Sequence, residues 1–196
     1  MSLEIEATPF PTFERWSAEA LKHEPSDPLA AALATVDDQC RPSVRMVLIK
    51  AWGPEGFTFY TNFESRKGRE LLANPNAAMC LHWKSIARQV RIEGAVTPVA
   101  DEVADAYFAT RDRGSRIGAW ASRQSRPLES PHALEKAVAA RTAEFGLGDV
   151  PRPPHWSGFL LAPRAVEFWD AGRFRLHRRL RYERSGEGWT ATALYP

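Results

Sequence analysis

The sequence predicts an α+β domain built on an antiparallel β-barrel of Greek-key type, with helices at its flanks. Short apolar or alternating segments recur between turn residues, as expected for strands joined by hairpins. Segments with apolar residues at helical spacing are inserted between these strands, which is typical of the α+β class. The length of 196 residues fits one domain, and a chain of this size can bury a core without disulfides.

The composition is that of an ordinary globular protein. Apolar residues make up 44% of the chain, charged residues 26%, and the formal net charge is +2. This small positive charge does not favour a nucleic-acid partner. Neither a secretory signal nor an apolar run of the roughly 20 residues of a membrane helix is present, so we expect a cytoplasmic protein with no membrane partner. Cys40 and Cys80 predict no disulfide framework, and the five histidines lack metal-ligand spacing, so no metal is expected.

The first half of the chain is expected to alternate helices with pairs of strands. A helix comes first because Phe13, Trp16 and Ala20 recur at helical spacing. Val44–Ile49 is almost continuously apolar, so its strand is expected to be buried on both faces, and Gly53–Gly56 provides the hairpin turn that follows. The expected elements are a helix at Thr12–Glu24, strands at Ala32–Val36, Ser43–Trp52 and Phe57–Tyr60, a helix at Ser65–Leu72, and strands at Ala77–Trp83 and Gln89–Pro98.

The second half is expected to hold two helices and then four short strands. A segment broken up by glycines separates the two helices and runs through Ser125, and the proline-rich connection Leu147–Pro154 is too short to mark a second domain. We divide the chain into an N-terminal arm and helix at 1–27 and a single domain at 28–196. The expected elements are helices at Asp101–Thr110 and Pro131–Phe145, and strands at Gly158–Leu161, Ala165–Trp169, Phe174–Tyr182 and Trp189–Leu194.

The segment Arg173–Arg184 has a row of basic side chains. If it forms one strand, one face is entirely basic or imidazole and the other is mostly apolar, with Arg178 as the exception. Like charges at every second position repel one another, so we expect an anion over this row. A solvated edge strand with protective charges explains the pattern equally well, whereas a nucleic-acid module would need more aromatic residues. The row consists of Arg173, Arg175, His177, Arg179 and Arg181.

A second basic group lies where a helix is expected to begin. Ser65 is suited to cap this helix, which places Arg66 and Lys67 in its first turn. The helix dipole disfavours cations there, so a phosphate held between these side chains and the free backbone N–H groups would account for them. The alternative is that both side chains extend into solvent, at a cost of a few tenths of a kcal/mol.

A third group consists of Tyr107, Arg111 and Ser115, which are spaced by four residues. Tyr107 and Arg111 are expected to share a helix face, and Ser115 to lie just past the helix end. Singly, Tyr107 fits a core aromatic and Arg111 a surface charge. Together, and with Lys50 from the neighbouring strand, they predict a second oxyanion receptor. Two such receptors suggest a phosphorylated cofactor and a phosphorylated substrate.

Several blocks of the sequence occur in a recognisable order between about Pro28 and Pro196. They are RMVLIK at Arg45–Lys50, FYTNFESRKG at Phe59–Gly68, RQVRIEG at Arg88–Gly94, YFATR and SRIGAWASRQS up to Ser125, VPRPPHWSGF, EFWDAGRFRLH and the C-terminal LYP. In this combination the chain resembles the pyridoxamine 5′-phosphate oxidase family. The resemblance implies an FMN-binding split barrel that works as a homodimer, with the flavin at the subunit interface.

The resemblance also implies roles for individual residues. Arg175 and His177 would lie over the pyridine ring of the substrate as the catalytic residues, with Arg175 orienting the substrate and helping to remove a proton. Lys50, Tyr107, Arg111 and Ser115 would bind the substrate phosphate. Arg66 and Lys67 would hold the phosphate of the flavin, and the partner subunit would supply several contacts. The set implied for FMN is Arg45, Met46, Val47, Leu48, Ile49, Lys50, Tyr60, Thr61, Arg66, Lys67, Gln89, Gln124, Ser125, Trp169 and Arg179.

The implied reaction converts pyridoxamine or pyridoxine 5′-phosphate to pyridoxal 5′-phosphate. Oxygen becomes hydrogen peroxide, and the amine substrate also releases ammonia. Three features depart from the family pattern: Arg178 stands where an acidic residue is usual, His82 replaces an apolar or aromatic residue, and the N-terminal arm is short. The alternatives are a related flavin oxidase of the phenazine-pathway type and a non-catalytic carrier of flavin or pyridoxal phosphate.

Overall fold

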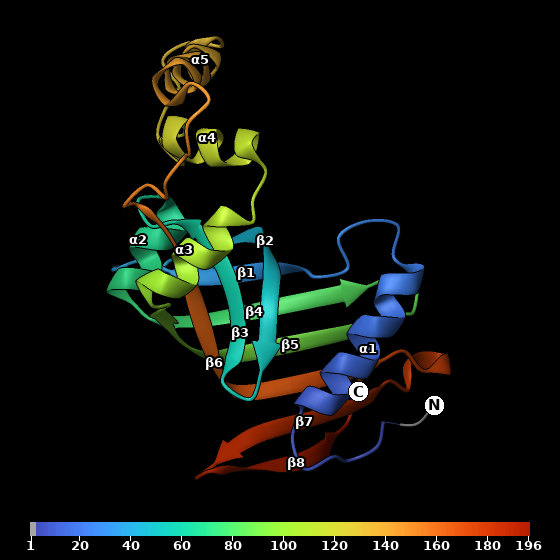
Figure 1. Cartoon of the computed structure of the whole chain (residues 1–196). Helices are drawn as coiled ribbons and strands as arrows, with labels where there is room; N and C mark the ends of the chain where they lie inside the picture. The colour runs from blue at the N-terminus through green and yellow to red at the C-terminus, as the bar shows by residue number, and fades with distance from the viewer. Residues whose placement is uncertain (1–2) are drawn as a thin grey trace.

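Figure 1 shows the computed structural model of the chain, which describes residues 3–196. Six strands close into an antiparallel barrel in the order β3-β2-β1-β4-β5-β6, with β6 paired back to β3, and β7 and β8 extend the sheet beyond β6. The α+β barrel that the sequence predicts is therefore confirmed.

The elements are α1 (Phe10–His23), β1 (Ala30–Val36), β2 (Pro42–Gly53), β3 (Gly56–Asn62), α2 (Arg66–Ala73), β4 (Asn76–Trp83), β5 (Arg88–Pro98), α3 (Asp101–Ala109), α4 (Arg113–Ala121), α5 (Ala133–Phe145), β6 (Trp156–Asp170), a 3₁₀ turn (Arg173–Arg175), β7 (Arg178–Ser185) and β8 (Gly188–Leu194).

The first four strands form a Greek key. β1, β2 and β3 follow one another as antiparallel hairpins. The chain then crosses over through α2, and β4 returns to pair with β1. A fourth strand that returns beside the first is the defining feature of this motif. The crossover places the start of α2 next to the ends of β1, β2 and β3.

Strand β6 has two different partners on one of its sides. The sequence predicted two short strands here, but the structure has one strand of 15 residues. The first part of β6 pairs with β3 and the last part with β7, whereas β5 pairs with it along almost its whole length. The change of partner coincides with a bulge in the β5–β6 pairing. Gly94 pairs with Pro163 and its neighbour Glu93 pairs with Ala165, so one step along β5 corresponds to two steps along β6. The bulge bends the strand and tolerates Pro163, which has no N–H to donate.

Helix α1 packs its apolar face against the core of the barrel (Figure 1). Phe13 is fully buried, with its ring centroid 4.9 Å from that of Phe57. Trp16 contacts Phe168 edge to face, with 5.2 Å between the ring centroids. The helix begins at Phe10, slightly earlier than expected, because Pro11 is tolerated in its first turn. The N-terminal helix is therefore part of the barrel core.

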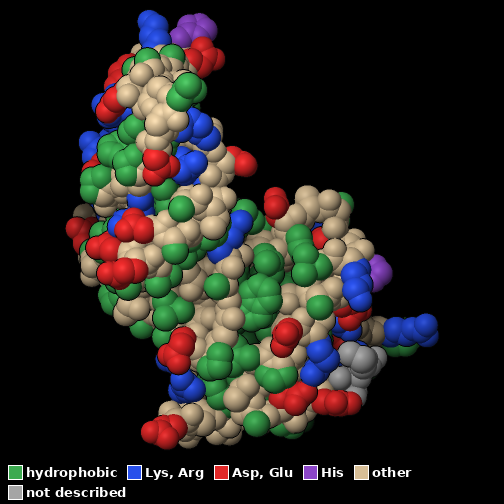
Figure 2. All heavy atoms as spheres, viewed as in Figure 1, with side chains coloured by type: hydrophobic (Ala, Val, Ile, Leu, Met, Phe, Trp, Pro, Cys, Tyr) green, Lys and Arg blue, Asp and Glu red, His purple; other side chains and the backbone are tan. Residues whose placement is uncertain are grey.

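The expectation that β2 is buried on both faces is wrong. Val47 and Ile49 point into the core, whereas Val44, Met46 and Leu48 are exposed on the opposite face. Figure 2 shows hydrophobic side chains gathered over β2 and β3 on this side of the molecule. A continuous apolar run predicts a strand that is buried on both faces. In a single chain, however, this antiparallel strand is covered on one face only. Exposed apolar rows of this kind mark surfaces that contact another molecule.

The expectation of one strand over Arg173–Arg184 is wrong in its first part. A 3₁₀ turn forms at Arg173–Arg175, and β7 begins only at Arg178. Phe174 and Arg175 have φ values of 57° and 63°, in the left-handed region. This conformation breaks the alternation that a strand requires. The basic row predicted from the sequence is therefore divided between the turn and the strand.

The segment broken up by glycines forms helix α4 rather than an irregular stretch. Helix α3 ends at Ala109, so Arg111 lies in the turn after it and does not share a helix face with Tyr107. Ser115 lies within α4. In Figure 1, α4 and α5 project together from one end of the barrel, and α5 has no buried residue. None of the helices within residues 3–196 combines the length and the apolar character needed to cross a membrane.

The bulge between β5 and β6 predicts a sharp difference between two glycines. A Cβ atom at Gly94 would lie 2.0 Å from the carbonyl oxygen of Ala162, whereas a Cβ atom at Gly114 in α4 would meet nothing within 4 Å. We expect Gly94→Ala to lower the free energy of unfolding by about 1–3 kcal/mol or more. The control Gly114→Ala leaves it unchanged or raises it by up to about 1 kcal/mol. Urea unfolding followed by circular dichroism measures both, and equal stabilities would contradict the packing described here.

Candidate active site

The first turn of α2 begins at the end of the β3 strand, as the sequence predicts. The hydroxyl of Ser65 accepts a hydrogen bond from the Gly68 N–H at 3.2 Å, which confirms Ser65 as the N-cap. A Cβ atom at Gly68 would lie 2.4 Å from the carbonyl oxygen of Phe63, so only glycine allows the helix to approach the strand this closely. Arg66 and Lys67 therefore both lie in the first helical turn.

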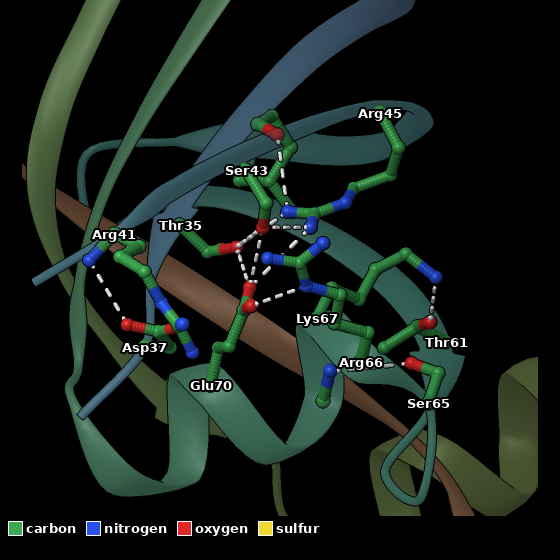
Figure 3. A network of polar contacts seen from close by, with 12 residues as sticks. Thr35, Asp37, Arg41, Ser43, Arg45, Thr61, Ser65, Arg66, Lys67 and Glu70 are labelled. Carbon is green, nitrogen blue, oxygen red and sulfur yellow. Dashed lines mark hydrogen bonds and ion pairs between the residues drawn. The ribbon is translucent and has the colours of Figure 1, made fainter. Parts of the chain in front are cut away.

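A buried carboxylate, Glu70, organises the basic residues near this turn (Figure 3). Its Oε1 accepts from the Nε of Arg66 at 2.8 Å, and its Oε2 accepts from Ser43 at 2.7 Å and from the Nη2 of Arg45 at 3.3 Å. Thr35 also donates to Oε2. Burial alone would raise the pKa of Glu70, but these hydrogen bonds and the charge of Arg66 hold the pKa at about 2. Glu70 is therefore ionised at neutral pH.

The basic residues outnumber the carboxylates at this position. Lys67 donates to Thr61 and to Gln124, both at 3.1 Å, and forms no ion pair within residues 3–196. Burial lowers the pKa of Lys67, and the nearby charge of Arg45 lowers it further. Arg45, Arg66 and Lys67 thus carry three positive charges against the one carboxylate of Glu70. An anion at this place would offset the surplus.

A cavity of about 440 Å³ adjoins this basic cluster. It lies between β2, β3 and α4, so the β strands form its floor and the helix forms its wall. Several of the predicted flavin and substrate residues line it together. They are Met46, Val47, Tyr60, Thr61, Lys67, Arg111, Ser115 and Gln124, with Asn62, Gly118, Ala119, Ser122 and Trp156 in addition.

Arg111 is a cation without a polar partner. Its Nη1 is buried and makes no hydrogen bond within the described residues. The guanidinium lies 4.8 Å from the ring centroid of Trp156 and 5.5 Å from that of Phe108, so aromatic faces surround it. Burial lowers the pKa of Arg111, although nearby Tyr107 opposes this shift. A buried N–H donor with no acceptor among the described residues would suit an anionic ligand.

A second hollow of about 270 Å³ shares a wall with the first. Lys50, Tyr107 and Arg111 line it, together with Leu48, Tyr60 and Trp156. The structure therefore brings together Lys50, Tyr107 and Arg111, three of the four residues of the second predicted oxyanion receptor. Ser115 lines only the neighbouring 440 Å³ cavity, and the two hollows share Tyr60, Arg111 and Trp156.

Three aromatic rings are stacked between the two hollows. The Tyr60 and Tyr107 rings are nearly parallel, with centroids 3.9 Å apart, and Trp156 is nearly parallel to Tyr60 at 5.3 Å. Burial raises the pKa of the Tyr60 hydroxyl. Trp156 is not among the predicted site residues, although it lies in the VPRPPHWSGF block that carries the family resemblance. Its contact with Arg111 could not be predicted from the sequence, because the two residues are far apart in the chain.

The remaining predicted residues lie elsewhere in the chain. Gln89, Trp169 and Arg179 occupy one row across β5, β6 and β7. The ring of His177 lies 4.6 Å from that of Trp169, and its Nδ1 accepts from the Gly172 N–H at 3.3 Å. The exposed Arg175 belongs to the adjacent turn. This group forms a second, separate half of the predicted site.

The two halves do not meet within one chain. Trp156 belongs to the first half and Trp169 to the second, and both lie on β6. They are 13 positions apart, which corresponds to roughly 40 Å along an extended strand. Neither hollow beside Arg111 is lined by the second-half residues Gln89, Trp169, Arg175, His177 and Arg179.

A few predicted residues have surroundings that differ from the expectation. The side chain of Ile49 is buried in the core, so only its backbone is available to a ligand. Ser125 has a left-handed backbone (φ 68°) and lines a separate hollow next to Gln124. Arg178, which the sequence left unexplained, forms an ion pair with Asp170. Glu70 was missed because a carboxylate in a helix gives no sequence signal of burial.

The arrangement fits a flavin mononucleotide together with a second phosphate ester. The start of α2 offers N–H groups and an excess of basic side chains, which suits a phosphate. Arg111 offers an unsatisfied buried donor beside Lys50, which suits a second one. The cavity between them has aromatic walls that can contact planar rings.

Family models match most of the chain. A model described as pyridoxamine 5′-phosphate oxidase matches residues 17–143, and one described as the pyridoxine 5′-phosphate oxidase C-terminal dimerisation region matches residues 156–196. Curated relatives named pyridoxine/pyridoxamine 5′-phosphate oxidase are similar over almost their full length. The protein of Rhizobium johnstonii is 60% identical over 190 residues, covering 96% of this chain and 92% of the relative, and that of Brucella canis is 58% identical over 192 residues, covering 97% and 95%.

Solved structures agree with this similarity. PhzG from Burkholderia lata 383, in complex with tetrahydrophenazine-1-carboxylic acid, is 35% identical with a TM-score of 0.92, over 98% of this chain and 95% of that one. A pyridoxamine 5′-phosphate oxidase-related, FMN binding protein from Nostoc punctiforme has a TM-score of 0.78 at 17% identity, over 98% and 100% of the two chains, and so supports the fold alone. The family resemblance drawn from the sequence motifs is confirmed, and the chain belongs to the pyridoxamine 5′-phosphate oxidase family.

Proposed function

We propose that this protein is an FMN-dependent oxidase that converts pyridoxine and pyridoxamine 5′-phosphates to pyridoxal 5′-phosphate. The observation that carries the proposal is Arg111, a half-buried cation whose buried Nη1 has no acceptor within the described residues. It stands beside Lys50 and Tyr107, separate from the basic cluster at the start of α2. Two phosphate receptors on either side of an aromatic cavity match a phosphorylated cofactor and a phosphorylated substrate.

The residues around α2 would hold the phosphate of FMN. Arg66 and Lys67 would contact it with charged side chains, and the first N–H groups of the helix would donate to it. Tyr60, Thr61 and Gln124 line the adjoining cavity, where the ring system would lie. When bound, FMN supplies the acceptor for the hydride that leaves the substrate carbon, and O₂ then takes up the electrons as H₂O₂.

The residues around Arg111 would fix the substrate by its phosphate. A charged guanidinium beside the ammonium of Lys50 suits a phosphate dianion better than a neutral group. Tyr107 and Ser115 would add hydroxyl donors. Holding the substrate at its phosphate would set the position of its ring and so orient the reacting carbon towards the acceptor.

Arg175 and His177 would act on the opposite side of the substrate ring. In this proposal Arg175 orients the amine or alcohol and helps to remove its proton, and His177 lies next to it. The exposed position of the turn that carries Arg175 supports this, because a turn of this kind can project beyond its own subunit.

A homodimer would assemble the site from two chains. The second-half residues do not line the hollows beside Arg111 in one chain, and the C-terminal segment matches a dimerisation region. The exposed apolar residues Val44, Met46 and Leu48 on β2 offer a face that a second copy would cover. The catalytic turn of one subunit would then face the Arg111 cavity of the other.

The phenazine-type alternative has one observation in its favour, the close structural similarity to PhzG. The ligand of that protein is a carboxylic acid, which carries a single negative charge. The pairing of Lys50 with Arg111 around one hollow favours a doubly charged phosphate instead. Turnover of a phosphorylated pyridine substrate therefore separates the two proposals.

The visible spectrum of the purified protein tests the proposal directly. We expect a yellow protein whose flavin absorbance near the blue region bleaches when pyridoxine 5′-phosphate is added without oxygen, and recovers when oxygen is admitted. Unphosphorylated pyridoxine is the control, and it should bleach the flavin far more slowly because it cannot engage Arg111. A yellow protein that does not bleach would indicate a carrier or another substrate, and a colourless one that cannot be reconstituted with FMN would remove the proposal.

Replacing Arg111 should weaken phosphate recognition specifically. We expect Arg111→Ala to raise the KM for pyridoxine 5′-phosphate roughly 10- to 100-fold, since a hydrogen bond to a charged group contributes about 1.5–3 kcal/mol. The slow reaction with unphosphorylated pyridoxine should change little. Arg141→Ala, which removes a half-buried arginine of α5 that lines neither hollow, is the matched control. Equal losses with both substrates would argue against a phosphate contact.

Subunit complementation tests whether the site is shared. Arg175→Ala should retain FMN yet reduce turnover at least about 100-fold, and Arg111→Ala should be poorly active at low substrate. If each site takes Arg111 from one subunit and Arg175 from the other, a mixed dimer of the two variants contains one intact site. Refolding the variants together at equal amounts should therefore restore roughly a quarter of the wild-type rate. A mixture no more active than its components would show that each site is built within one chain.

A further inference from the structure

We infer that Glu70 is a positioning residue, which fixes the guanidinium groups of Arg45 and Arg66 in the orientation that receives the phosphate of FMN. This inference rests on the function proposed above. Glu70 is almost completely buried and lies in the second turn of α2, one turn after the proposed phosphate contacts. It would act through its arginine partners and would not itself contact the cofactor.

The position of Glu70 is fixed by groups on three elements. Thr35 on β1 and Ser43 on β2 donate to its Oε2, so the carboxylate is tied to the barrel. Arg66 on α2 donates its Nε to Oε1 at 2.8 Å. Figure 3 shows Glu70 at the centre of these contacts, with the two arginines approaching from different sides. The carboxylate therefore joins the helix to the strands.

The pattern of hydrogen bonds leaves one edge of Arg66 free. Glu70 takes only the Nε group, and no hydrogen bond within residues 3–196 uses the two Nη groups of Arg66. More than half of the Arg66 side chain is exposed, so the free edge is accessible. The Nη groups of a guanidinium held at its Nε by an internal carboxylate remain available, and they can make two parallel hydrogen bonds to a phosphate.

Arg45 is held more completely. Its Nη2 donates to Glu70 at 3.3 Å and also to Ser43, and its Nη1 donates to Thr35 and to the Leu33 carbonyl. Arg45 therefore contributes its charge from a fixed place behind the site. Without Glu70, this cation and that of Arg66 would repel each other, and the flexible Arg66 side chain would turn towards solvent.

The net charge of Glu70 and its positioning of the arginines predict opposite effects on FMN affinity when the carboxylate is removed. A carboxylate near a phosphate repels it, so removing the charge of Glu70 should strengthen FMN binding if only the net charge mattered. If Glu70 acts by holding the arginines, the same change should weaken FMN binding. The mobile Arg66 side chain would then have to become ordered when FMN binds, and the entropy lost in this ordering opposes association. The sign of the effect distinguishes the two.

The test is the affinity of the full-length chain, freed of flavin, for FMN and for riboflavin, followed by the quenching of flavin fluorescence. We expect Glu70→Gln to weaken FMN binding at least about 10-fold, equivalent to about 1.4 kcal/mol. Riboflavin, which lacks the phosphate, should bind the variant and the wild type equally. Glu93→Gln is the matched control, because Glu93 also pairs with arginines, namely Arg164 and Arg181, which are not among the proposed site residues.

Two outcomes would overturn the inference. FMN binding that is unchanged or tighter in Glu70→Gln would show that the carboxylate does not position the arginines, and an equal loss for FMN and riboflavin would show a structural role only. If Glu70→Gln does not fold, Ser43→Ala decides, since Ser43 donates to Glu70 and accepts from Arg45. A loss confined to FMN supports the inference, and no loss overturns it. A wild-type chain that binds no flavin would instead refute the proposed function.

A double variant measures whether Glu70 and Arg66 are coupled in FMN binding, which a general loss of stability would not reveal. If Glu70 acts through Arg66, the losses of FMN affinity in Glu70→Gln and Arg66→Ala should be less than additive when combined. Fully additive losses would mean that the two residues act independently, which would contradict the positioning role.

Discussion

The organisation of this molecule depends on positive charge held partly out of water without enough carboxylate to balance it. Lys67 and Arg111 form no ion pair within the described residues, and burial lowers the pKa of both. Desolvating an unpaired cation is unfavourable, so two such places close together would suit anions that arrive with a ligand. The rings of Tyr60 and Trp156 line the cavity between these places, where they could contact a planar group.

Strand β6 is the element that makes this arrangement possible. Its first part closes the barrel against β3 and so places Trp156 beside Tyr60. Its last part stays paired with β5, pairs with β7 on its other side and places Trp169 13 positions along the strand from Trp156. The bulge opposite Gly94 lets one strand follow both courses. The same strand thus builds one half of the site and separates it from the other half.

The local chemistry of the site could be read from the sequence, whereas its three-dimensional connections could not. Ser65, Arg66 and Lys67 are adjacent in the chain, and a helix cap followed by two cations is a local pattern that the structure confirms. Arg111 and Trp156 are 45 residues apart and meet where the end of α3 packs on the start of β6, with Phe108 edge to face on Trp156. The strand predicted at Phe174–Tyr182 is wrong in its first part, because alternation of charge gives no warning of a left-handed turn at Phe174. The burial of Glu70 has no local sequence signal, since its partners come from β1 and β2.

A site divided between the two ends of one long strand has a consequence for assembly under the proposed function. The Arg111 half already contains its cations, its aromatic stack and its organising carboxylate within a single subunit. The half that carries Arg175 also holds Gln89, Trp169 and Arg179, which belong to the residue set expected for FMN, and its turn is exposed. Under the proposed function the second chain would therefore bring both the catalytic turn and part of the cofactor site. Dimerisation would then affect FMN binding as well as chemistry, because both kinds of contact lie on the second half.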